Sequence, residues 1–207
     1  MTNRIIPTAV INPDAPPESL EAKQPAIDNG AEIYGKSGYF SHEQVEQEWQ
    51  KIWTDSWLIA GVSTDLPNVG DYFLFKVRSE SLIITKTTEG IKAFYNVCPH
   101  RGARLVTEER GNKKVFVCPF HSWSFHNNGE LRTITDEDTF QEAVICHRPG
   151  LTAAACQEHA GLIFISMADQ PPALADVIGL PEGYLENYHI DKMRVVRHVR
   201  SEWGSNW

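Results

Sequence analysis

Residues 98–123 of this 207-residue chain read CPHRGARLVTEERGNKKVFVCPFHSW, and this stretch decides the fold. It contains Cys98-Pro99-His100 and, after seventeen intervening residues, Cys118-Pro119-Phe120-His121. Cysteine offers a soft anionic sulfur and histidine a borderline nitrogen, so each segment can supply two metal ligands. The proline after each cysteine fixes one backbone angle and helps to hold the segment in one shape. If the two segments face each other as hairpin tips, their four ligands converge on one site.

Two kinds of metal centre fit this ligand set. Structural zinc sites usually leave two or more residues between the ligands of a pair, whereas Cys98 and His100 are separated by one. A Rieske [2Fe-2S] cluster has both cysteines on one iron and both histidines on the other, so each loop must offer one of each. The observed pattern fits that requirement directly. A structural zinc module is the alternative from a different class, and colour separates the two, because zinc is colourless and the cluster is red-brown.

The sequence around these segments predicts a mainly β fold, an antiparallel β domain with an N-terminal amphipathic helix and irregular flanking segments. The helix, of about three turns, is expected after Ser41, since Val45, Trp49, Ile52 and Trp53 follow at helical spacing. Asn127-Asn128-Gly129 predicts a tight hairpin, because Asn and Gly accept a positive φ. Alternating or compact apolar runs predict strands over residues 72–77, 82–86, 91–96, 115–118, 123–125, 130–134, 162–166 and 195–199.

Composition argues against several partners and compartments. Lysine plus arginine number 19 against 27 for aspartate plus glutamate, a net charge of −8 without any basic stretch, so neither nucleic acid nor an anionic membrane surface is expected as a partner. No apolar run is long enough to span a bilayer, and no signal-peptide pattern opens the chain, so a cytoplasmic location is expected. Four cysteines are too few for a disulfide scaffold. Residues 1–38 contain many prolines and glycines without a sustained period, which suggests an extended arm.

At this point the chain resembles the large α subunit of the Rieske non-haem iron oxygenases, also called ring-hydroxylating oxygenases. The resemblance implies that Cys98 and Cys118 bind one iron of the cluster, while His100 and His121 bind the other. It also implies a division into an arm (1–38), a Rieske domain (39–170) and a connector (171–207). The motifs that carry it are residues 98–103, 118–125 and 129–131, with support from residues 70–72 and 161–164.

The resemblance further implies a function in electron transfer. Such a domain accepts electrons from a ferredoxin or reductase, with NADH as the distant source, and passes them to a mononuclear non-haem Fe(II). That iron lies in a catalytic domain expected beyond Asn206-Trp207, and it hydroxylates an aromatic-type substrate with dioxygen. The full-length protein would form a homotrimer or an α3β3 assembly. No catalytic residue is assigned within this chain, because His189, Asp191 and His198 lack the spacing of a shared helix face.

A free-standing Rieske ferredoxin, a simple electron carrier, is the alternative reading. The arm, the helix and the segment from Pro171 to Trp207 all exceed what a minimal carrier needs. Respiratory-chain Rieske proteins are similar too, but they brace the cluster with a disulfide whose positions here are Ala103 and Phe120. They also donate a serine hydroxyl where this chain has Trp123, so a lower redox potential is expected. Ser122 departs from the glycine that the oxygenase family usually has, and its hydroxyl could tune the cluster.

Other candidate residues are interpreted as structural. Cys146 and Cys156, with His147 and His159, are expected to be a buried pair of thiols and a solvated pair of imidazoles, not a second metal site. Trp49, Trp53 and Trp57 are expected to pack in the core, and Trp123 to lie over the cluster and screen it from water. His126 is expected to be exposed. Arg101 and Arg104 fit either contacts with an acidic partner or ordinary surface ion pairs.

Overall fold

A computed structural model describes residues 36–140, 150–197, 199 and 201–204. Residues from His42 to Ser205 form one compact unit. Of the second unit, which contains the first forty-one residues, only residues 36–41 are described, and they hold a short 3-10 helix, η1 (Lys36–Tyr39). The arm predicted over residues 1–38 therefore lies almost entirely outside the described residues. Within the described part of the chain, no helix is long and apolar enough to cross a membrane.

The large unit begins with the predicted helix. α2 (His42–Glu48) starts directly after Ser41 and continues as one π-helical turn, η2 (Trp49–Trp53). The expectation that its tryptophans are core residues is wrong, because Trp49 and Trp53 are only partly buried and neither belongs to a core cluster. The Arg78 guanidinium lies 5.3 Å from the centre of the Trp49 ring and also pairs with Glu46. The polar partner explains why this aromatic side chain stays at the surface.

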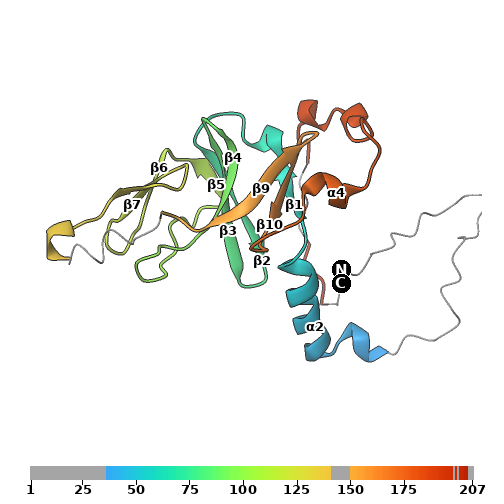
Figure 1. Ribbon diagram of the computed structural model, residues 1–207, viewed down its shortest axis with the longest axis horizontal. Coiled ribbons are helices and arrows are strands. Elements are labelled where there is room, and N and C mark those ends of the chain that lie inside the picture. The colour runs from blue at the N-terminus through green and yellow to red at the C-terminus, as the bar shows by residue number, and fades with distance from the viewer. Residues whose placement is uncertain (1–35, 141–149, 198, 200, 205–207) are drawn as a thin grey trace, which may run out of the picture. The chain divides into compact units, whose positions relative to one another are not determined.

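Two antiparallel sheets make up the rest of the unit (Figure 1). The larger sheet has seven strands in the order β1-β10-β9-β4-β3-β2-β5, and the smaller one has three in the order β6-β7-β8. Short helical turns are η3 (Ser63–Asp65), η4 (Glu137–Thr139), α4 (Leu174–Ile178), η5 (Glu186–Tyr188) and η6 (Ile190–Lys192). The strands are β1 (Leu58–Val62), β2 (Asp71–Val77), β3 (Glu80–Thr87), β4 (Gly90–Tyr95), β5 (Arg110–Asn112), β6 (Val115–Val117), β7 (Ser124–His126), β8 (Leu131–Thr133), β9 (Ala153–His159) and β10 (Leu162–Ser166).

The larger sheet separates two apolar cores. Strand β3 serves both, since Ile83 packs into the first core while Leu82 and Ile84, which point the other way, pack into the second. The first core also contains Cys98 and Cys118, together with the apolar face of the smaller sheet. Two of the candidate metal ligands, Cys98 and Cys118, therefore lie on the side of the larger sheet that faces the first core.

The mainly β fold and most of the predicted strands are confirmed, including the hairpin at Asn127–Gly129 that joins β7 to β8. The strand predicted over residues 195–199 is wrong. Residues 195–197 and 199 form no strand, and Val195, Val196 and Val199 are exposed. An apolar run becomes a strand only where a neighbouring strand can accept its hydrogen bonds. Sequence patterns did not predict β1, β5 and β9.

Candidate functional site

Two short loops carry the four predicted ligands. Loop 1 (residues 98–103) follows β4, and loop 2 (residues 118–123) joins β6 to β7. In each loop the cysteine N–H donates to the carbonyl five residues on: Cys98 to Ala103 and Cys118 to Trp123, both at 2.7 Å. The two loops thus close with the same hydrogen bond over the same length of chain.

A second hydrogen bond completes the likeness between the loops. The N–H of the residue four positions after each cysteine donates back to the cysteine carbonyl, from Gly102 at 2.9 Å and from Ser122 at 3.0 Å. Both residues have a positive φ, +75° at Gly102 and +59° at Ser122. Glycine adopts this conformation freely, whereas serine pays a steric cost. Loop 2 therefore reproduces the backbone of loop 1 with a residue poorly suited to it.

The side chains of the loops sort into two layers. Cys98 and Cys118 are buried, with 1% and 2% of their surface exposed. His100 and His121 are only partly buried, and the centres of their rings lie 4.6 Å apart. The structure thus brings the two cysteines together inside the first core and the two imidazoles together toward the surface.

The Cys98 sulfur occupies an environment that suits a metal thiolate. Burial raises the pKa of its thiol, and nearby Cys118 adds to that rise, while the backbone N–H groups of His100 and Arg101 donate to the sulfur and partly oppose it. Even a buried thiol loses its proton when its sulfur binds a metal ion, because the positive metal takes the place of the proton. The two N–H donors then stabilise the resulting negative sulfur.

His121 shows the clearest sign of a missing partner. Its Nδ1 atom is buried, yet it makes no hydrogen bond. A buried polar nitrogen without a partner is costly and rare in folded proteins. A metal ion bonded to Nδ1 would satisfy it, so the donor set fits an iron centre.

The side chain of one buried asparagine, Asn96, hydrogen-bonds to the segment that follows loop 1. Asn96 is 3% exposed, and its Oδ1 accepts from the N–H groups of Leu105 and Val106, both at 3.0 Å. Its Nδ2 donates to the Val106 carbonyl at 2.8 Å and to Ser81 Oγ at 3.3 Å. One side chain thereby fixes the chain just before and just after loop 1. No sequence pattern indicates this role, because the partners of Asn96 lie about ten residues away in a segment without regular structure.

Aromatic rings surround the two histidines. Trp123, which is 1% exposed, stacks on His100 with ring centres 4.6 Å apart and only 7° between the planes. Phe120 lies against His121 at 4.0 Å but is 63% exposed. Trp123 therefore contacts a histidine directly, where the sequence predicted a cover over the cluster. A cavity of about 250 Å³ opens beside these rings and is lined by His100, His121, Ser122, Trp123, Thr135, Asp136, Thr139 and Phe140.

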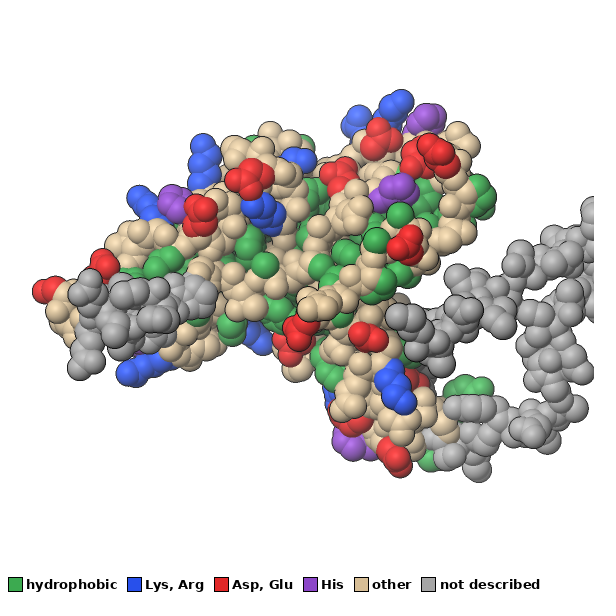
Figure 2. Space-filling view, viewed as in Figure 1, with side chains coloured by type: hydrophobic (Ala, Val, Ile, Leu, Met, Phe, Trp, Pro, Cys, Tyr) green, Lys and Arg blue, Asp and Glu red, His purple; other side chains and the backbone are tan. Residues whose placement is uncertain are grey.

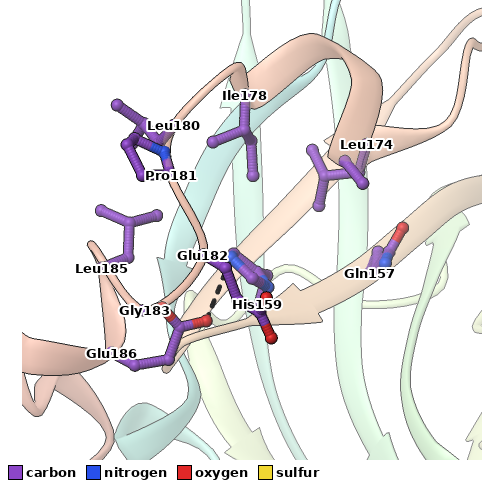
Figure 3. A pocket seen from close by; sticks show the side chains of 11 residues that line it. Gln157, His159, Leu174, Ile178, Leu180, Pro181, Glu182, Gly183, Leu185 and Glu186 are labelled. Atoms are coloured by element: carbon purple, nitrogen blue, oxygen red, sulfur yellow. Dashed lines mark ion pairs between the residues drawn. The ribbon is translucent and has the colours of Figure 1, made fainter.

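The structure describes two members of the second Cys/His set, Cys156 and His159. Cys156 is partly buried against the second core, and burial raises the pKa of its thiol to about 12. His159 pairs with Glu186 at 3.5 Å, beside a mainly apolar pocket of about 260 Å³ between β9 and residues 174–186 (Figure 3). Cys146 and His147 lie outside the described residues.

The remaining predicted residues are surface groups. His126 is exposed, as expected, and so are Arg101 and Arg104. His189 and Asp191 are exposed as well, and His198 lies outside the described residues. Figure 2 shows acidic and basic side chains intermingled over the visible face of the molecule, with no basic stripe across it.

Comparison with known protein families agrees with this geometry. Residues 56–147 match the family model described as "Rieske [2Fe-2S] domain". This segment of the chain is a Rieske [2Fe-2S] domain. The range of the match contains both loops and the four predicted ligand residues, so the resemblance drawn from the two motifs is confirmed.

The relatives of this Rieske domain are oxygenase subunits. The chain is 32% identical to the glycine betaine monooxygenase oxygenase subunit of Chromohalobacter salexigens, over 77% of this chain and 36% of the relative. It is 34% identical to the large oxygenase component of the naphthalene 1,2-dioxygenase system of Pseudomonas putida, over 74% of this chain and 34% of the relative. The chain therefore spans about a third of the length of these relatives.

Solved structures give the same result. Naphthalene 1,2-dioxygenase with indole bound in its active site superposes with a TM-score of 0.61 and 35% identity, over 66% of this chain and 31% of that one. A quaternary ammonium Rieske monooxygenase, described in terms of carnitine oxidation and inter-subunit electron transfer, superposes with a TM-score of 0.64 and 30% identity, over 74% and 41%. The likeness confirms the Rieske-type β fold.

Proposed function

We propose that Cys98 and Cys118 hold one iron of a [2Fe-2S] cluster and that His100 and His121 hold the other. The buried Nδ1 of His121, which has no hydrogen-bond partner, is the observation that carries this assignment. The burial of both cysteines and the 4.6 Å between the histidine rings support it. When bound, such a cluster accepts and releases one electron at a time.

The protein's own groups determine how electrons enter and leave. The first core keeps water from both cysteines, and the backbone N–H groups of His100 and Arg101 stabilise negative charge on the Cys98 sulfur. The two imidazoles are the ligands that reach the cavity beside the loops. A redox partner therefore approaches the centre from the histidine side, where the path through protein is shortest.

In the full-length protein, this domain would relay electrons from a ferredoxin or reductase to a mononuclear non-haem iron. The support is that the relatives are oxygenase subunits of about three times the matched length. Residues 39–170 would form the Rieske domain and residues 171–207 the connector, within a homotrimer or an α3β3 assembly. The activity would be dioxygen-dependent hydroxylation of an aromatic-type substrate, with quaternary ammonium compounds as the competing class, since both occur in the names of the relatives.

Metal analysis of anaerobically purified protein tests the ligand assignment. We expect equal amounts of iron and acid-labile sulfide, and an electron paramagnetic resonance signal after reduction. His121→Ala should abolish both, whereas His126→Ala, at an exposed imidazole five residues away, should abolish neither. Zinc alone in the protein, or a cluster retained in His121→Ala, would overturn the assignment.

A further inference from the structure

The Trp123 side chain lies across the boundary between the two loops. Its carbonyl closes loop 2 by accepting from the Cys118 N–H, and its indole stacks on the histidine of loop 1. The corresponding residue of loop 1 is Ala103, which is too small to support His121 in return. The two histidines are therefore held in different ways, although their loops share one backbone shape.

His100 is held on several sides by aromatic rings. Trp123 covers one face of the imidazole at 7° from parallel, which is a favourable stacking geometry. Phe140 meets both rings edge-on, 6.2 Å from His100 at 80° and 5.9 Å from Trp123 at 74°. Rotation of the imidazole about its Cβ–Cγ bond would break both contacts. Among the described residues, the rings against His121 are the exposed ring of Phe120, at 4.0 Å, and the His100 imidazole itself, at 4.6 Å.

We propose that Trp123 is a positioning residue that fixes the plane of the His100 imidazole. This inference rests on the proposed function, since it concerns how one ligand is presented to the cluster. The transfer of unpaired spin from iron to an imidazole nitrogen depends on the orientation of the ring. A fixed ring gives one well-defined coupling, and a ring free to rotate gives a broad distribution. Plain core filling would place a large apolar side chain at this position but would not require a parallel stack.

Pulsed electron paramagnetic resonance of the reduced holoprotein tests the proposal, because it resolves the couplings of the two histidine nitrogens. We expect Trp123→Leu to shift or broaden one of the two couplings and to leave the other unchanged. Trp123→Phe keeps an aromatic ring at this position and should give the same two couplings as the wild-type protein. Phe125→Leu is the matched control, since Phe125 is fully buried in the same core and lies two residues beyond Trp123, in β7.

The possible outcomes separate this inference from the proposed function. Unchanged couplings in Trp123→Leu, or equal changes in Trp123→Leu and Phe125→Leu, would overturn the positioning role while leaving the cluster assignment intact. A wild-type protein without a cluster signal would overturn the assignment itself. If Trp123→Leu does not bind iron, Phe140→Leu decides, because loss of the edge contact should alter the same single coupling, and two unchanged couplings would overturn the proposal.

Discussion

At the residue scale, Ser122 and Gly102 make a matched pair. Both stand four positions after a cysteine and both have a positive φ, yet only one is glycine. Ser122→Gly should raise the free energy of unfolding by about 1 kcal/mol, because it removes the steric cost of that backbone conformation. Gly102→Ala should lower it by about 1 kcal/mol through the backbone alone, since a methyl group there would meet no atom within 4 Å. Urea denaturation measures both changes, and changes of the same sign would contradict this account.

The redox potential is a second property set by single residues. The resemblance to respiratory Rieske proteins implies that Ala103 and Phe120 stand at the positions of their bracing disulfide, and Trp123 at that of their serine donor. Fewer hydrogen bonds to the sulfurs leave the reduced cluster less stabilised, so we expect a midpoint toward the lower end of the range of roughly −150 to +300 mV. Protein-film voltammetry near neutral pH measures it. A midpoint above about +200 mV would instead indicate a respiratory-type carrier.

At the scale of elements, Asn96 joins the end of β4 to the segment after loop 1. Asn96→Ala would leave the N–H groups of Leu105 and Val106 and the Val106 carbonyl buried without that partner. We expect a loss of about 2–3 kcal/mol in the free energy of unfolding. Asn128→Ala is the control, because its bond to the Glu130 N–H is exposed and water can replace it. Equal losses in the two variants would show that Asn96 does not secure the loop.

The same scale shows how far a sequence could predict this molecule. The four predicted ligands lie in short segments with fixed spacing, so local pattern was enough to predict them. Strands β1 and β9 were not predicted because their sequences, LIAGV and AAACQEH, contain small or polar residues with weak β propensity. They become strands because both pair with β10. The contact of Trp123 with His100 joins two loops across more than twenty residues, and no local pattern encodes such a partner.

At the scale of the whole molecule, the chain should transfer electrons without hydroxylating anything by itself. Within the described residues, no group of three or more His, Cys, Asp or Glu side chains is arranged to hold a single metal ion. The proposed cluster needs only two protein ligands on each iron, whereas an oxygen-activating iron needs a facial triad. We predict that the purified chain takes up one electron per cluster from a reductase and forms no product with dioxygen. Product formed by this chain alone, from an aromatic or a quaternary ammonium substrate, would reveal a second iron site.

The two apolar cores on either side of the larger sheet affect the order of folding and cluster insertion. The second core contains none of the four proposed ligands, so hydrophobic burial can assemble it, and the strands that it shares with the first, before any iron is bound. Cluster insertion would then be a late step, performed on a chain whose scaffold is already built. Hydrogen exchange on protein made without iron should find the amides of β10 protected and those of the two loops open. A cell short of iron would thus accumulate a folded precursor that can still be loaded.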